Sequence, residues 1–178
     1  MRRSRIHVLG ASGSGTTTLG RGLADHWAVP HADTDDYFWM PSDPPYVAKR
    51  PVDERLALMR RMFVPREAWV LSGSMSGWGD EIVAECDAIV FLTLDTDERL
   101  RRLDAREEKR RAGGRFDEVA WAAFQEWARG YDDPEFDGRS LATHEAWLAG
   151  VDKPVLRLDS RMSRADLVEA VLAWEPPA

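Results

Sequence analysis

A glycine-spaced segment near the start of the chain limits its fold more than any other feature. Gly10, Gly13 and Gly15 follow a short apolar run at 5–9 and precede a segment at 17–27 whose apolar residues recur four apart. A short apolar run that stops at glycine predicts a strand, and the four-residue spacing predicts a helix. The residues between must form a tight strand-to-helix loop, because glycine adopts backbone conformations that other residues avoid.

The rest of the chain repeats this alternation. Further short apolar runs lie at 31–33, 69–71, 88–92 and 154–158. Helical patterns lie at 53–62, 97–111, 119–131, 141–148 and 163–174, and the proline-rich segment 37–50 is expected to be irregular. Five apolar runs separated by helices predict an α/β fold in which a parallel sheet is covered on both faces. We expect a single domain over residues 1–178.

The glycine loop fits a phosphate-binding pattern. Residues 10–17 match G-x-x-x-x-G-K-[ST] at every position except the lysine, where Thr16 stands. Glycines let backbone N–H groups surround an anion, and the following helix adds the positive end of its dipole. The residues predicted to hold a nucleotide are Gly10, Ser12, Gly13, Ser14, Gly15, Thr16, Thr17 and Thr18. The alternative is an ordinary glycine-rich turn.

Two carboxylates follow the second short strand. Asp33 and Asp35 lie at the carboxyl edge of the predicted sheet, where ligands of open α/β folds bind. One carboxylate could hold Mg²⁺ while the other accepts a proton from an acceptor hydroxyl. We expect Asp33 and Thr17 to contact the metal and Asp35 to be catalytic. Alternatively, Asp33, Asp35 and Asp36 are turn formers and helix caps.

These motifs resemble those of a known family. The loop, the Asp33-x-Asp35 pair, the glycine turn after the third strand and the arginine-rich helix at 97–111 are similar to those of adenylate-kinase-like P-loop kinases, which include nucleotide, shikimate and gluconate kinases. The resemblance spans nearly the whole chain. It implies a three-layer α/β/α P-loop NTPase fold with a five-stranded parallel sheet, a helical lid, and ATP with Mg²⁺. Thr16 departs from the family, as does Leu71-Ser72-Gly73, which lacks a Walker-B-type aspartate.

The resemblance also implies roles for the arginine-rich helix and for the glycine turn. The lid would cover about 106–135, and its arginines would neutralise the transferring phosphate, with Arg106 and Arg110 as candidates beside Gly113 and Gly114. Alternatively, these arginines pair with acidic residues on a solvated helix face. The phosphate acceptor would contact the turn at 72–80, where Gly73 and Trp78 are the candidates. The other candidate contacts of the acceptor are Asp33, Tyr37 and Trp39. For the aromatic residues, core packing is the alternative.

Composition narrows the range of partners. The net charge is -7, which disfavours nucleic acid as a ligand, and no stretch is apolar enough for a membrane span. Cys86 is the only cysteine, which excludes an intrachain disulfide, and a cytoplasmic location is expected. The resulting hypothesis is a kinase that transfers a phosphoryl group from ATP to a small metabolite or nucleotide. A non-catalytic nucleotide-binding module or regulatory ATPase is the alternative, and the oligomeric state is left open.

Overall fold

The computed structural model describes residues 1–43, 45–111 and 117–177. The strands are β1 (Arg5–Gly10), β2 (His31–Asp33), β3 (Trp69–Ser72), β4 (Ala88–Thr93) and β5 (Val155–Asp159). The helices are α1 (Thr16–Trp27), α2 (Thr34–Phe38), α3 (Val52–Met62), α4 (Asp80–Val83), α5 (Thr96–Arg111), α6 (Glu118–Arg129), α7 (Leu141–Ala149) and α8 (Arg164–Ala173), with a 3₁₀ turn, η1 (Gly130–Asp132).

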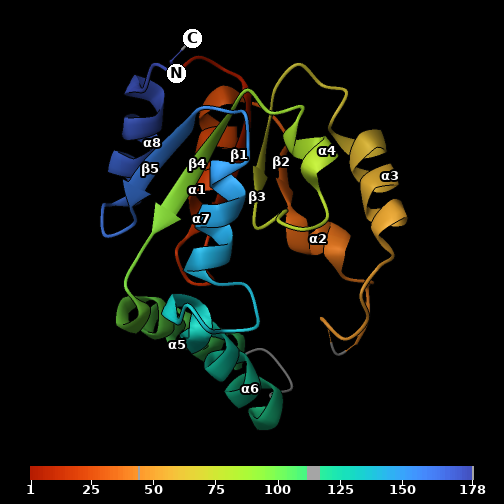
Figure 1. The fold of residues 1–178 in the computed structure, drawn as a ribbon, viewed down its shortest axis with the longest axis vertical. Coiled ribbons are helices and arrows are strands. Elements are labelled where there is room, and N and C mark those ends of the chain that lie inside the picture. Colours follow the sequence, from red (N-terminus) through yellow and green to blue (C-terminus); the bar gives the residue numbers. More distant parts are fainter. Residues whose placement is uncertain (44, 112–116, 178) are drawn as a thin grey trace.

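All five strands form one parallel sheet in the order β2-β3-β1-β4-β5, which confirms the predicted sheet (Figure 1). The strand that leads into the glycine loop is central, because Val8 pairs with Ser72 on one side and with Val90 on the other. The carboxyl end of β1 is therefore held from both sides. This fixes the point from which the loop departs.

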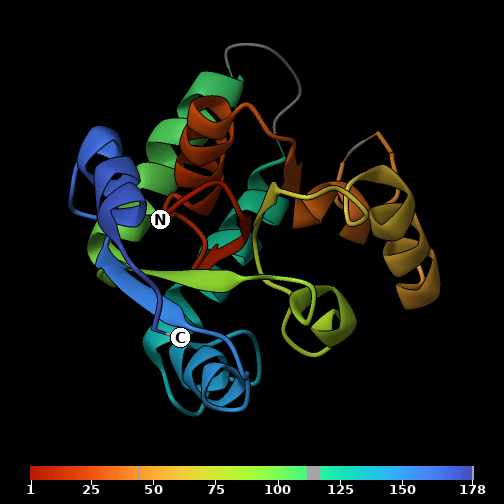
Figure 2. The same ribbon diagram turned by 90° about the horizontal axis from the view of Figure 1, so that it is seen from above.

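Helices cover both faces of the sheet, which gives the predicted three-layer α/β/α fold. Helices α1 and α8 lie on one face, and α4 and α7 lie on the other (Figure 2). Alternating side chains of β1 enter different clusters: Val8 packs with Leu23 of α1 and Val171 of α8, whereas Leu9 belongs to the cluster on the opposite face. Both faces of the strand are buried, which is why its sequence reads as a continuous apolar run.

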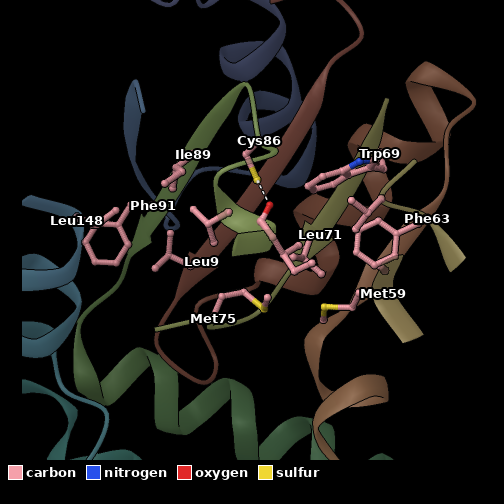
Figure 3. Packing of buried hydrophobic residues seen from close by; sticks show 14 residues of the cluster. Leu9, Met59, Phe63, Trp69, Leu71, Met75, Cys86, Ile89, Phe91 and Leu148 are labelled. Atoms are coloured by element: carbon pink, nitrogen blue, oxygen red, sulfur yellow. Dashed lines mark hydrogen bonds between the residues drawn. The ribbon is translucent and has the colours of Figure 1, made fainter. Parts of the chain in front are cut away.

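The cluster on the opposite face contains the single cysteine (Figure 3). Cys86 is 2% exposed, and its thiol points at the carbonyl oxygen of Ile82 in α4, 3.9 Å away. Burial raises the pKa of Cys86 to about 12. The thiol is therefore a small, protonated core group, as its position before a buried strand indicates.

Helices α5 and α6 lie beyond the carboxyl ends of the strands, away from the main layers (Figure 1). They share a small apolar cluster that includes Leu103, Ala128 and Trp127. Arg99 is fully buried beneath this pair, where it donates to the carbonyl oxygen of Ala128 and pairs with Asp132 at 3.0 Å. The predicted lid corresponds to this region, although Gly113, Gly114 and Arg115 lie outside the described residues.

Three local features differ from the sequence-based expectation. Two short helices, α2 and α4, were not anticipated, and the helix expected over 119–131 ends at Arg129 and continues as η1. Helix α2 begins because the side chain of Asp33 accepts a hydrogen bond from the backbone N–H of Asp35. Within the described ranges, no helix is long and apolar enough to cross a membrane.

Candidate phosphate-binding site

The glycine loop has the backbone that its sequence predicts. Gly13 and Gly15 have φ angles of +85° and +90°, a region that L side chains rarely adopt. At Gly13 a Cβ atom would also lie 2.6 Å from the carbonyl oxygen of Arg99. The loop is closed by a hydrogen bond of 3.1 Å from Ser14 N to Ala11 O. Its conformation therefore depends on glycine at these two positions.

Several backbone donors of the loop are left open. In the described part of the chain, the N–H groups of Gly13, Gly15, Thr16 and Thr17 have no hydrogen-bond partner. Open donors at the start of a helix, next to the positive end of its dipole, favour an anion. The site therefore fits the phosphate groups of a nucleotide. The loop is anchored from behind by Ser160, whose Oγ donates to Ser14 O at 2.5 Å.

A hydrogen-bonded cluster of side chains joins the start of α1 to the ends of β2 and β3. Thr17 Oγ1 donates to Asp33 Oδ2 at 2.8 Å, and Ser72 Oγ donates to the same oxygen at 3.3 Å. His31 Nε2 lies 2.9 Å from Ser72 Oγ. Ser72 occupies the end of β3, and the carboxylate of this cluster comes from Asp33 on the neighbouring strand. Sequence reasoning noted Ser72 only within the segment that lacks a Walker-B-type aspartate, and it gave no role to His31, which belongs to no recognisable motif.

The residues present fit a magnesium ion only together with bound phosphates. Within the described ranges, no three His, Cys, Asp or Glu side chains are grouped to hold a metal. Thr17 and Asp33 offer a hydroxyl and a carboxylate oxygen, which are the hard ligands that Mg²⁺ prefers. Mg²⁺ usually takes few protein ligands and completes its shell with waters and substrate phosphates, and this site suits that mode of binding.

Asp35 lies beside this cluster and is electrostatically perturbed. Its side chain is solvent-accessible, yet surrounding protein raises the pKa of its carboxyl, and the negative charge of Asp33 raises it further. The positive charge of Arg139 opposes both effects. The helix-cap alternative also holds in part, because Asp33 caps α2 while it accepts from Thr17.

The predicted acceptor residues are divided between two environments. Tyr37 packs against the core residue Phe63, with ring centroids 5.7 Å apart, so core packing accounts for it. Trp78 packs against the same core cluster, and its ring centre also lies 6.0 Å from that of Phe38, whereas the ring centre of Trp39 lies 4.9 Å from that of Phe38. The three predicted aromatic residues thus do not form one wall, and Phe38, which was not singled out, lies between two of them.

Gly73, another predicted acceptor contact, follows β3 directly and has a left-handed conformation with φ of +104°. Its carbonyl oxygen accepts a hydrogen bond of 2.7 Å from His7 Nε2, and its N–H donates to Val8 O at 2.9 Å. A Cβ atom at this position would collide with Thr34. The turn is therefore held directly against β1 and the start of α2.

Arg55 of α3 is a candidate that the sequence analysis missed. It is 6% exposed, and its guanidinium lies 3.8 Å from the ring centre of Phe38 and 5.1 Å from that of Trp78. Its Nε donates to Arg50 O at 2.6 Å. None of the ion pairs in the described ranges involves Arg55. A buried cation without a carboxylate partner is costly unless a ligand supplies the anion.

The two predicted lid arginines lie apart from the loop contacts. Arg106 is exposed, and Arg110 pairs with Glu107 at 3.5 Å and lies 5.9 Å from the ring centre of Tyr46. The pair with Glu107 matches the solvated-face alternative. The structure brings neither arginine to the loop, and their proposed role depends on movement of α5.

A different arginine does reach the loop. Arg139, at the start of α7, donates from Nη2 to Ser12 Oγ at 2.8 Å, and its guanidinium lies 4.9 Å from the ring centre of Trp127. No local pattern in the sequence marks this residue, because it is separated from Ser12 by most of the chain. Only the packing of α6 and α7 near the loop reveals it.

Residues 6–121 match the model of a protein family described as an AAA domain. The chain belongs to this family. The matched region of this AAA-domain chain contains the glycine loop, Asp33, Asp35, Gly73 and all of α5, and it ends before Arg139. The chain is also 39% identical over 177 residues, 97% of each sequence, to the "Uncharacterized protein YqaC" of Bacillus subtilis (strain 168).

Solved structures show the same fold. A gluconokinase from Sinorhizobium meliloti 1021 matches with a TM-score of 0.55 and 19% identity, over 97% of this chain and 92% of that one. A shikimate kinase from Bacteroides thetaiotaomicron matches with a TM-score of 0.55 and 17% identity, over 94% and 95% of the two chains. The AAA-domain chain therefore has a P-loop kinase-like fold, as its motifs imply.

Proposed function

We propose that the protein transfers a phosphoryl group from ATP to a hydroxyl group of a small acceptor. The observation that supports this most strongly is the contact between Thr17 and Asp33. It joins two oxygen ligands suited to Mg²⁺ directly beside the open N–H donors of the loop. Phosphoryl transfer requires chiefly positioning and charge neutralisation, and both are available here.

The roles of the residues follow from their positions. The loop N–H groups bind the phosphates, and Thr17 and Asp33 hold Mg²⁺, which supplies positive charge to the phosphate oxygens when bound. Asp35 accepts the proton of the acceptor hydroxyl as the new P–O bond forms, while the bond to ADP breaks. Its raised pKa suits this role, because a more basic carboxylate is a better proton acceptor.

The acceptor carries an anionic group that Arg55 binds. This part of the proposal rests on the burial of Arg55 between Phe38 and Trp78, without a carboxylate partner in the described ranges. Burial, followed by the nearby charge of Arg50, lowers the pKa of Arg55, which means that the site disfavours the lone cation. A carboxylate or phosphate on the acceptor would offset this cost.

Acceptor-dependent release of ADP tests the proposed activity. Purified protein is incubated with ATP, Mg²⁺ and one candidate acceptor at a time, drawn from nucleotides, sugar acids and other hydroxy acids. The proposal expects ADP only when an anionic acceptor is present. Neutral sugars of matched size serve as the control. ATP binding without ADP release across the whole panel would contradict phosphoryl transfer to these classes.

One observation favours a second candidate, a nucleotide-binding module without turnover. Thr16 stands where the loop lysine of the kinase pattern would contact the phosphates, and it makes no side-chain hydrogen bond within the described residues. In such a module, bound ATP would favour one arrangement of α5 and α6 over another. ATP binding that protects α5 and α6 from hydrogen exchange, with no ADP formed, would support this alternative.

A further inference from the structure

The loop lacks its lysine, and among the described residues two cations lie where they could compensate. Arg102 and Arg139 both approach the loop from other elements, α5 and the start of α7. A cation near the β- and γ-phosphates normally neutralises charge that builds up during transfer. The question is which of the two has donors available for a phosphate.

Arg102 is already committed to protein partners. Its Nε pairs with Glu98 at 2.9 Å, and its Nη1 and Nη2 donate to the side chain and the carbonyl oxygen of Ser160 at 3.0 and 2.8 Å. Glu98 is shared with Arg101 and so offsets only part of its charge, but every nitrogen of the Arg102 guanidinium already has a protein partner. Arg102 therefore anchors the Ser160 segment behind the loop.

Arg139 differs in each of these respects. Its single side-chain hydrogen bond within the described ranges goes from Nη2 to Ser12 Oγ, a neutral group of the loop itself. Its Nε is shielded from solvent and has no partner there. None of the ion pairs in the described ranges includes it. A half-buried guanidinium with an unused donor and no ion-pair partner is suited to a bound anion.

The surroundings hold this side chain in place. The guanidinium stacks over Trp127 of α6 at 4.9 Å. The next residue, Ser140, caps α7 through a reciprocal pair of hydrogen bonds with Thr143, which fixes the backbone beside Arg139. A charged group is effective in a site when packing and backbone restrict it in this way.

Arg139 interacts with both the phosphate loop and Asp35, the proposed proton acceptor. It contacts the loop at Ser12, and it is close enough to Asp35 that each charge shifts the pKa of the other group, lowering that of Asp35 and raising that of Arg139. Burial acts more strongly on Arg139 and lowers its pKa overall. In the proposed reaction the phosphoryl group moves from the loop toward Asp35. Arg139 interacts with both, through Ser12 of the loop and through the charge of Asp35.

We infer that Arg139 is the catalytic cation that replaces the missing loop lysine and contacts the terminal phosphate of ATP. This inference rests on the proposed function. It differs from the lid hypothesis, because Arg106 and Arg110 are exposed or paired on the surface of α5. Arg139 approaches the loop from the opposite end of the lid region.

The affinities of Mg²⁺–ATP and Mg²⁺–ADP, measured by isothermal titration, test this inference without knowledge of the acceptor. A cation on the terminal phosphate should matter for ATP and not for ADP. Arg139→Ala should weaken ATP binding by about tenfold or more, with less than about a threefold effect on ADP. Arg139→Lys should retain part of the preference for ATP, and Arg139→Gln should lose it. If Arg139→Ala does not fold, the comparison of Lys with Gln decides.

A double variant separates a direct role from a structural one. Thr16→Lys in the Arg139→Ala background should restore tight ATP binding, because it returns the cation to the position it has in the kinase pattern. Arg164→Ala is the matched control, since Arg164 of α8 forms an exposed ion pair with Asp25 of α1. This control should leave both affinities unchanged.

Three results would overturn the inference, and they can be told apart. Equal losses for ATP and ADP without rescue by Thr16→Lys would make Arg139 structural. Unchanged affinities in Arg139→Ala, in a parent protein that binds ATP, would refute the inference and leave the proposed function intact. A parent protein that binds neither nucleotide would overturn the proposed function together with the inference.

Discussion

Thr17 Oγ1 and Asp33 Oδ2 are joined by a hydrogen bond of 2.8 Å, which connects the first turn of α1 to the end of β2. The bond brings the loop that would hold the phosphates next to the strand end that carries both carboxylates. None of the ion pairs in the described ranges neutralises Asp33. Its charge is therefore available to a bound cation.

Replacement of Asp35 should separate catalysis from binding. Asp35→Asn removes the proposed proton acceptor and should lower kcat by about two to four orders of magnitude. ATP affinity should stay within about tenfold, since Asp35 does not contact the loop. The neighbouring variant Asp36→Asn is the control for a general effect of charge on α2. An unchanged rate in Asp35→Asn would leave this residue with a structural role only.

The loop assignment depends on Gly15. With φ of +90°, Gly15→Val would force a β-branched residue into a conformation that it avoids, and the loop donors would be displaced. ATP binding should be abolished. Gly77→Val is a matched control, because Gly77 has φ of +80° and open space around it, but lies in another loop. If Gly15→Val binds ATP as tightly as the parent protein, the phosphate site is elsewhere.

Substitution of Arg55 should affect the acceptor and not ATP. Arg55→Met keeps the packing between Phe38 and Trp78 but removes the charge, and should raise the acceptor KM by about tenfold to a hundredfold. Steady-state kinetics with the best acceptor, together with titration of ATP, would measure both effects. Arg60→Ala, an exposed ion-pair residue on the same helix, serves as the control. Equal weakening of ATP and acceptor would argue against a specific anion site.

The arginines of α5 should differ sharply in their effect on stability. Arg99 is buried, ion-paired and bonded to the backbone, so Arg99→Ala should lower the free energy of unfolding by roughly 3 kcal/mol or more. The double variant Arg106→Ala/Arg110→Ala should leave the free energy of unfolding within about 0.5 kcal/mol, while the lid hypothesis expects turnover to fall. Chemical denaturation and the kinase assay measure the two effects. A large loss of stability in the double variant would mean that both arginines are structural.

Two buried histidines predict how stability depends on pH. Burial lowers the pKa of His7 to about 4 and that of His144 to about 3. The unfolded chain protonates these side chains near about pH 6.5, so between these values the unfolded state binds more protons and stability falls as pH falls. The free energy of unfolding should drop by up to about 1.4 kcal/mol per pH unit for each histidine below about pH 6.

Urea denaturation at several pH values, down to about pH 5, measures this slope. The raised pKa values of Asp35 and Asp36 act in the opposite direction, with an effect that grows at lower pH. His144→Gln, which can still bond to Tyr131 and Ser74, should remove the share of the slope that His144 contributes and leave the shares of His7 and of His31, whose pKa is also lowered by burial. A slope unchanged in this variant would show that His144 is not the source.

The sequence predicted the parts of the structure that depend on local pattern. The five strands and the loop follow from apolar runs and glycine spacing, and each strand lies within about one residue of its expected position. Asp33 and Asp35 could be singled out as candidates because they lie at the end of a strand, at the edge of the sheet where ligands bind. By contrast, α2 begins with a side-chain cap, and short capped helices carry little periodicity.

The missed site residues depend on long-range packing. Arg139 meets Ser12 only because α6 and α7 fold back toward the loop, and Arg55 meets Trp78 only because α3 packs beside the turn after β3. Neither arginine has a motif around it. The lid arginines were chosen for their spacing along a helix. Such spacing shows which side chains are neighbours on the helix, but it does not show which other part of the protein they contact.

The burial of Cys86 gives the protein an internal reporter of global opening. Because it is the single cysteine, 2% exposed and with a pKa raised to about 12, a thiol reagent can react only after the layer between α4 and the sheet separates. Movement of α5 and α6 alone would leave it protected. Alkylation kinetics followed by mass spectrometry would therefore distinguish unfolding of the sheet from motion at the nucleotide edge, in the parent protein without any introduced label.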